Sequence, residues 1–274
     1  MKLVLLSCFY LLLTSCSDPF NHESIQEEND RGIIEFAKVV GASHKVLTED
    51  WGIAAKSKIN HPSLNLAFIS RKVTPPEFEK ILKKVENFFQ SQAFTFWIEE
   101  KNKDLVPSFE KAGYHHISSF PGLYLRLNRE FGGLTPAHIS IRQVDSEETM
   151  RDWAFVTSTV QQLPYEPLLS FCQETLQKAP HVSFYVAYHQ QKPVSSRMMI
   201  IFNKTVTGYL SSTLQDYRSR GVASYLLSSV LTGLKKEGIQ YFVIQALSNP
   251  VVWKKFGLKE SGQVYMGFTK APKK

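Results

Sequence analysis

The sequence predicts an α/β protein made of two similarly organised halves. Helical and strand patterns alternate along the body of the chain. A polar stretch with glycine and proline, residues 128–138, interrupts them near the middle. Residues 109–127 and 253–268 then end the two halves with the same order of elements, a helix, a glycine and a strand that carries tyrosine. We therefore predict a separate N-terminal segment at 1–20, a first domain at 24–130 and a second at 137–271.

The elements of the first half follow from periodicity and from helix caps. Residues 34–40 continue a first helix, and the apolar residues 64–70 predict a strand. A helix then begins after Thr74, an N-cap residue followed by Pro75 in the first turn. Its apolar side chains recur at helical spacing: Phe78, Ile81, Leu82, Val85 and Phe89. The pattern next predicts a strand at 93–100, a short helix at 103–112 closed by Gly113, and strands around 114–118 and 123–127.

The second half repeats the alternation with more elements. A strand at 138–144 precedes a helix that Ser146 opens and that runs to about Leu163, and a further helix covers 166–179. Strands are predicted at 182–189, 197–202 and 206–213. A helix then extends to Lys236, with Gly238 as its stop, before a strand at 240–247, a short helix at 251–256 and a last strand at 263–268.

Composition narrows the class of protein. A hydrophobic share of 43% in 274 residues argues against disorder, and a net charge of +7 suits an anionic ligand. The basic residues are scattered, so we predict no nucleic-acid partner. The three cysteines, Cys8, Cys16 and Cys172, form no disulfide framework. The eight histidines form no set with metal-ligand spacing, and we predict no metal.

The N-terminus has the pattern of an export signal. Lys2 precedes an apolar run at 3–13 that is too short to span a bilayer. The tetrad Leu13-Thr14-Ser15-Cys16 resembles the lipobox of bacterial lipoproteins, with Cys16 as the lipidated residue. A buried first helix, or an extension upstream of the true start, are the alternatives.

One loop has the pattern of an anion site. A strand ends near Thr213, and a helix begins at about Arg220. The first amides of a helix lack intrahelical acceptors and attract phosphate oxygens, which the small Gly221 and Ala223 allow to approach closely. Arg218 and Arg220 add positive charge. A plain helix start with solvated basic residues is the alternative. The predicted contacts of the anion are Arg218, Ser219, Arg220, Gly221, Val222, Ala223 and Ser224.

This loop resembles the acetyl-CoA motif of the GNAT superfamily of N-acetyltransferases, which is Gln or Arg, two residues, Gly, one residue, then Gly or Ala. Arg218, Gly221 and Ala223 match it, and residues 254–258 stand where the family has aromatic-x-x-Leu-Gly-Phe. The resemblance covers residues 139–268. The first half looks like a degenerate copy in a tandem GNAT protein, because its nearest motif has Leu134 where a small residue is needed.

The resemblance implies, for each half, a mixed, mostly antiparallel twisted sheet flanked by helices. It also implies acetyl-CoA as the donor, a small-molecule or peptide amine as the acceptor, and Ser248 and Asn249 as pantetheine contacts. The backbone of the strand ending at Thr213 would contact the pantetheine arm and the thioester. Because acetyl-CoA is a cytoplasmic metabolite, we predict a cytoplasmic protein, with a lipoprotein anchored to the membrane through Cys16 as the alternative.

The chain departs from the family at the thiolate acid, a tyrosine four residues before the closing glycine. Counting back from Gly257 gives Trp253, whose indole is no usable proton source. Tyr209, Tyr265 or solvent would replace it, or activity is lost. Glu166 and Glu174 lie in the region that lines the acceptor site in GNATs, but no catalytic residue is assigned. Two functions stay open: an acetyl-CoA-dependent N-acetyltransferase, or a catalytically impaired module that binds acyl-CoA or a protein partner.

Overall fold

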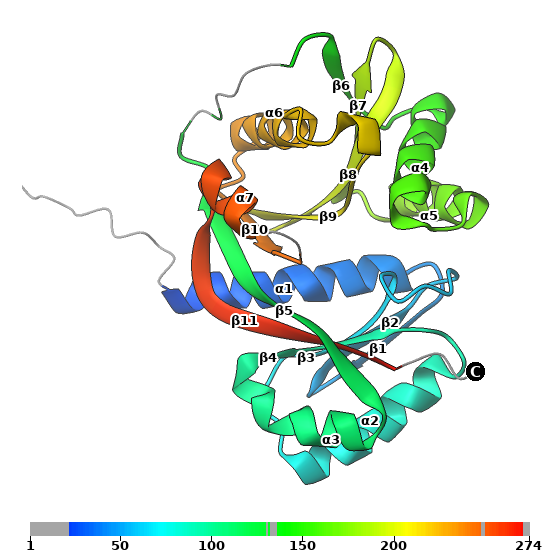
Figure 1. The fold of residues 1–274 in the computed structure, drawn as a ribbon, viewed down its shortest axis with the longest axis vertical. Coiled ribbons are helices and arrows are strands. Elements are labelled where there is room, and N and C mark those ends of the chain that lie inside the picture. Colours follow the sequence, from blue (N-terminus) through cyan, green and yellow to red (C-terminus); the bar gives the residue numbers. More distant parts are fainter. Residues whose placement is uncertain (1–21, 130, 132–135, 248–249, 271–274) are drawn as a thin grey trace, which may run out of the picture.

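The computed structural model describes residues 22–129, 131, 136–247 and 250–270. Within these residues one mixed sheet of eleven strands runs through the molecule, with helices on both faces (Figure 1). The strands are β1 (Lys45–Glu49), β2 (Gly52–Lys56), β3 (Asn65–Ile69), β4 (Thr95–Glu99), β5 (Tyr114–Arg126), β6 (Ile139–Gln143), β7 (Val182–His189), β8 (Lys192–Phe202), β9 (Thr205–Thr213), β10 (Tyr241–Gln245) and β11 (Lys259–Lys270). The α-helices are α1 (His22–Gly41), α2 (Pro75–Phe89), α3 (Val106–Lys111), α4 (Glu147–Gln161), α5 (Tyr165–Lys178), α6 (Val222–Lys236) and α7 (Pro250–Phe256), and the short 3₁₀ helices are η1 (Glu100–Leu105) and η2 (Gln215–Tyr217).

The sheet has the order β1-β2-β3-β4-β11-β5-β10-β9-β8-β7-β6. Its neighbours are antiparallel except for two parallel pairs, β3 with β4 and β9 with β10. The expectation of a mixed, mostly antiparallel sheet flanked by helices is confirmed. The proposed division of the chain at the linker stays a prediction, because both halves contribute strands to this one sheet.

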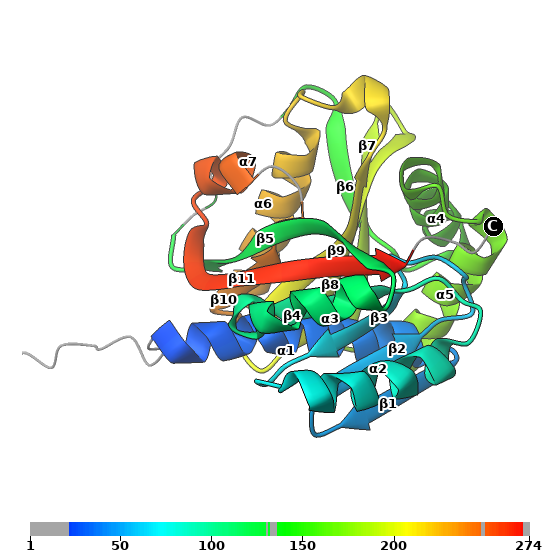
Figure 2. The ribbon, with the colours of Figure 1, turned by 60° about the horizontal axis from the view of Figure 1, so that its bottom comes forward.

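The two long strands at the centre of the sheet each cross to the other half. β5, which follows α3, pairs with β10, and β11, which follows α7, pairs with β4. β5 and β11 also pair with each other, with Phe120 opposite Tyr265. Figures 1 and 2 show the two strands side by side across the middle of the molecule. Each half therefore completes its hydrogen-bonded ladder with the last strand of the other.

Three apolar clusters hold the helices against the sheet. One lies between α6 and β8 to β10, where Leu227 and Leu231 pack with Met199 and Phe242. A second joins α2 and α3 to β2–β4 through residues such as Phe78, Phe96 and Phe109. The third lies around α1, α4 and α5 and includes Phe36, Trp153 and Phe184. Burying such side chains is the main favourable contribution to folding.

The number of strands differs from the sequence prediction in two regions. The hairpin of β1 and β2 was not predicted, because β2 is buried at all five positions and shows no alternation of apolar and polar residues. The two strands expected in residues 114–127 form the single strand β5. Pro121 and Gly122 suggested a break, but Pro121 lies opposite Val264, where the register of β11 shifts, and such an irregular position tolerates a missing N–H.

Candidate active site

The parallel strands β9 and β10 separate part of the way along their length. Their pairing ends at Val243 opposite Thr207, although β9 continues to Thr213 and β10 to Gln245. On its other edge β10 stays paired with β5 as far as Gln245 opposite Gly122. The backbone edges of β9 and β10 therefore face an opening in the sheet, and such edges offer hydrogen-bonding groups to a ligand.

A bulge lies in β9 beside this opening. Ser196 of β8 is opposite Ser212, and Met198 is opposite Tyr209, so Arg197 alone faces both Leu210 and Ser211. Leu210 has a φ of 50°, in the left-handed region that a branched side chain seldom adopts. A bulge redirects side chains and releases backbone groups from the ladder, which is a frequent arrangement next to active sites.

The loop after β9 leads into the N-terminus of α6. Gly221 is the N-cap residue with a φ of 77°, and no side chain caps the helix. The helix begins at Val222, two residues later than predicted. Arg218 donates from Nε to the carbonyl oxygen of Thr213 at 3.1 Å, and the guanidinium of Arg220 lies 5.7 Å from the ring centroid of Tyr217. Both arginines are exposed, so this positive helix end is open to an anion.

A first cavity of about 160 Å³ lies between the sheet and α6 and α7. We call it the donor groove. It brings together three of the predicted contact residues, Thr213, Ala223 and Ser224. Val222 is buried in the core instead, and Ser219 is exposed with a φ of 59°. Ser248 and Asn249 lie outside the described residues. The rest of the lining is Ser195, Ser196, Arg197, Ser211, Ser212, Leu226, Leu227, Val252, Trp253 and Phe256.

A second cavity of about 470 Å³ lies on the side of α1 and α4. We call it the acceptor cavity. Its wall is mostly apolar and comes from both halves of the chain, with Phe36, Trp97 and Phe120 from the first half and Leu210 and Ile244 from the second. Ser211 and Trp253 line this cavity and the donor groove alike. The half-buried indole of Trp253 thus stands where the two spaces meet.

Two titratable side chains line the acceptor cavity. Tyr209 is buried, stacks on Phe36 with ring centroids 4.0 Å apart, and donates from its hydroxyl to Gln245 Oε1 at 2.7 Å. Burial raises the pKa of this phenol above its ordinary value. Burial lowers the pKa of His61, whose Nδ1 lies 2.7 Å from Ser63 Oγ, so the imidazole is neutral at pH 7. Sequence patterns gave no signal for His61, because its place in the wall depends on distant strands.

Glu166 and Glu174, which the sequence placed in the acceptor region, line neither the donor groove nor the acceptor cavity. Glu166 is exposed on α5, and Glu174 pairs with Lys58 at 2.6 Å, which lowers the pKa of the carboxyl group. Tyr188 donates to Asp152 Oδ2 at 2.8 Å. Tyr185 packs against the apolar cluster under α6.

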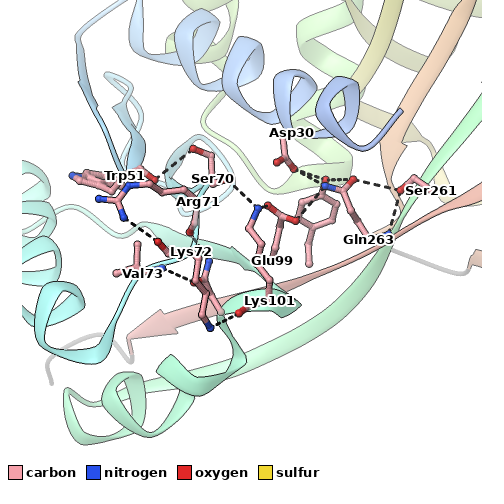
Figure 3. Close-up of polar contacts among 12 residues, drawn as sticks. Asp30, Trp51, Ser70, Arg71, Lys72, Val73, Glu99, Lys101, Ser261 and Gln263 are labelled. Atoms are coloured by element: carbon pink, nitrogen blue, oxygen red, sulfur yellow. Dashed lines mark hydrogen bonds and ion pairs between the residues drawn. The ribbon is translucent and has the colours of Figure 1, made fainter. Parts of the chain in front are cut away.

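Tyr265 belongs to a separate polar cluster between α1, β4 and β11. Figure 3 shows Asp30, Glu99, Lys101 and Gln263 of this cluster. Its hydroxyl donates to Asp30 Oδ1 at 2.7 Å, and Gln263 Nε2 donates to both Asp30 and Glu99, at 3.0 and 3.2 Å. Lys101 forms an ion pair with Glu99. Burial, together with the charge of Glu99, raises the pKa of Asp30 to about 8. This cluster ties the crossing strand β11 to the first half.

The described residues contain no group of three His, Cys, Asp or Glu side chains close enough to hold a metal ion. Among the helices of the described part of the chain, none is long and apolar enough to cross a membrane.

No family model matches the sequence, and no curated protein matches it. Solved structures do match its fold. A GCN5-related N-acetyltransferase from Kribbella flavida has a TM-score of 0.64 at 14% identity, over 87% of this chain and 95% of its own. The GCN5-related N-acetyltransferase from Sphaerobacter thermophilus has a TM-score of 0.60 at 13% identity, and the match covers 81% of this chain and 77% of that one. A Drosophila protein has a TM-score of 0.61 at 13% identity, and the match covers 92% of this chain and 91% of that protein. The chain therefore has the fold of the GCN5-related N-acetyltransferases.

Proposed function

We propose that this protein is an N-acyltransferase that uses acyl-CoA, of which acetyl-CoA is the simplest donor, to acylate an amine. The observation that supports it most is the opening between β9 and β10, which leads from the uncapped N-terminus of α6 to the junction of two cavities. Residues 218–224 would hold the pyrophosphate, and the donor groove would hold the pantetheine arm. Metal ions have no part in this proposal.

In the proposed reaction the amine nitrogen attacks the thioester carbonyl carbon, the carbon–sulfur bond breaks, and CoA leaves as a thiolate. The products are an amide and CoA. We assign removal of the amine proton to His61, which is neutral at pH 7 and lines the acceptor cavity. We assign the return of a proton to the thiolate to solvent, because Tyr209 already donates to Gln245 and the indole of Trp253 is too weak an acid.

The wall of the acceptor cavity favours an apolar amine, most simply an aromatic one. Phe36, Trp97, Phe120 and Trp253 line it, and no described carboxylate does. A polycationic acceptor such as an aminoglycoside would lose its hydration there without gaining an anionic partner. A free amine that carries one aromatic ring would bury its ring against these side chains.

The test is release of free thiol from acetyl-CoA with matched amines. We expect benzylamine to support turnover and spermidine to give none. His61→Gln should lower kcat about 100-fold, the usual contribution of a general base, while the affinity for CoA is unchanged. The alternative function, a catalytically impaired module, is favoured by Trp253 at the junction. It would be supported if CoA bound but no amine released thiol.

We further infer that the first half is a degenerate copy of the second. The order of three strands, helix, strand, helix and strand occurs in both, as β1–β5 with α2 and α3 and as β7–β11 with α6 and α7. The parallel pair occupies the same place in each series. On this proposal the first half forms a wall of the acceptor cavity and binds no CoA.

We place the protein in the cytoplasm, where acyl-CoA is made and kept. Residues 1–20, including Cys16, lie outside the described part of the chain. Fractionation of cells grown with a labelled fatty acid tests the placement. We expect an unlabelled protein in the soluble fraction, whereas a label that Cys16→Ala removes would establish the lipoprotein instead.

A further inference from the structure

A buried arginine lies in the donor groove. Arg197 lies on β8, opposite the bulge of β9, and only 3% of the residue's surface is exposed. Side chains alternate along a strand, so Arg197 shares the α6 face with Met199. It lines the donor groove with Ala223, Ser224 and Trp253, and it does not line the acceptor cavity.

No described group neutralises this guanidinium. Its Nη1 is buried without a hydrogen-bond partner, and no described carboxylate lies within ion-pair distance. Two hydroxyls of the groove bond elsewhere, since Ser195 Oγ lies 2.8 Å from Thr213 Oγ1 and donates to Ser212 O at 2.7 Å. Its one described favourable contact is the face of Trp253, with 5.6 Å from the guanidinium carbon to the ring centroid.

The chain retains this charge at a cost. Burying a cation without an anion is unfavourable even after the protein relaxes. Burial lowers the pKa of Arg197 to about 10, so the group is still charged at neutral pH. Gly208 of β9 makes room for it, since a Cβ there would lie 3.1 Å from Nη1. A glycine inside a strand marks such a close approach.

We propose that Arg197 binds a carboxylate at the end of the donor's acyl group, so that the acyl group transferred is that of a dicarboxylic acid, such as succinyl or glutaryl. This inference rests on the proposed function and narrows its donor. The carboxylate belongs to the acyl end of the donor because Arg197 lines the donor groove, not the acceptor cavity, and contacts Trp253 at the junction where the thioester would react. In the transfer the carboxylate undergoes no bond change, and the amide product keeps it free.

The test compares three ligands on the full-length protein by calorimetry: CoA, S-butyl-CoA and S-(3-carboxypropyl)-CoA. The two thioethers cannot react and differ only in a terminal methyl or carboxylate. We expect the wild type to bind the carboxylate form at least about tenfold more tightly than the butyl form, as for a hydrogen bond between charged groups. Arg197→Met should abolish that preference. Arg218→Met, the matched control, should weaken all three ligands by the same factor.

A thermal unfolding scan without ligand shows whether Arg197→Met folds, and its melting temperature should rise because an unpaired buried charge is removed. The wild-type comparison decides even if that variant does not fold. Equal affinity of the wild type for both thioethers would overturn the inference and leave the proposed function standing. A preference for the carboxylate thioether that persists in Arg197→Met would do the same. Absence of binding by CoA and by both thioethers would overturn the proposed function and the inference together.

Discussion

The two parallel strand pairs of the sheet occupy corresponding places in the two halves, yet one is closed and the other open. β3 and β4 pair from Leu66 opposite Thr95 to Ile69 opposite Ile98. The pairing thus continues to Ile69, the last residue of β3. β9 pairs with β10 over residues 205–207 only, and its remaining length borders the two cavities. One topology thus gives a continuous ladder in one half and a ligand-sized opening in the other.

The loops that follow these strand pairs differ in the same way: the loop of the first half is closed by internal contacts, and that of the second half is open. In the first half Asn102 of η1 is fully buried, accepts from the amide of Val73 at 3.0 Å and donates to the carbonyl of Arg71 at 2.8 Å. Arg71 also binds Asp50 and Glu77, and Lys72 binds Asp104. In the second half Arg218 and Arg220 are exposed, and Gly221 is the N-cap residue of α6. In the first half, therefore, internal partners occupy the loop's backbone groups and charges. In the second half the corresponding groups stay accessible to a ligand.

The largest effect is expected from cutting the chain between the halves. Residues 137–271 alone would lose β5, the partner of both β10 and β11, and residues 22–129 would lose β11. An unpaired central edge exposes backbone groups and apolar surface, so neither piece should unfold cooperatively by itself, while the two co-expressed pieces should associate. Size-exclusion chromatography and thermal unfolding measure this. A monomeric piece that melts like the intact chain would show that the halves are independent.

An intermediate effect is expected from a substitution in the open half. Gly221→Val places a β-branched residue at a φ of 77°, which the loop must change to accommodate. We expect CoA to bind about 100-fold more weakly while the fold is retained, as for loss of a preorganised anion site. The matched control in the closed half is Thr74→Val, at the exposed N-cap of α2, where no side-chain capping bond exists. Calorimetry should find its CoA affinity unchanged, and equal losses in both variants would refute the comparison.

The smallest effect, counted per pH unit, is expected at the polar cluster of the crossing strand. Because the folded pKa of Asp30 is about 8 and its ordinary value is 3.8, the folded chain keeps a proton that the unfolded chain releases. Stability should therefore fall as pH rises from about 4 to about 8, by at most about 1.4 kcal/mol per pH unit for one proton.

Asp30→Asn removes this titration and should flatten the dependence, which urea unfolding at pH 5, 6, 7 and 8 would measure. Asp104→Asn is the control. Lys72 lowers the pKa of that exposed carboxyl, so its contribution to stability is lost only in acid. The dependence of stability on pH above pH 5 should therefore not change in this variant. If the wild type shows no slope between pH 5 and 8, Asp30 is ionised in the fold.

The sequence predicted those features that depend on near neighbours. The helix after Thr74 and Pro75 begins where expected, with its five periodic apolar residues buried, and Ser146 forms a capping box with Thr149. The loop before α6 has the uncapped helix end that Gly221 and Ala223 indicated. Helical periodicity and capping involve residues no more than four positions apart, so a short window of sequence contains the information.

The tertiary structure alone decided which distant segments meet. The crossing of β5 and β11 is not visible in either strand, because apolar alternation shows that a strand has a buried face but not which strand it joins. His61 lines the acceptor cavity together with residues of the second half, and Gln263 of β11 meets Asp30 and Glu99 only through that crossing. Arg197 was one basic residue among many in the sequence, and only the packing of β9, α6 and α7 around it removes both water and counter-charge. Burial of a charge depends on everything that surrounds it in space, and for these residues the surroundings come from positions far away along the chain.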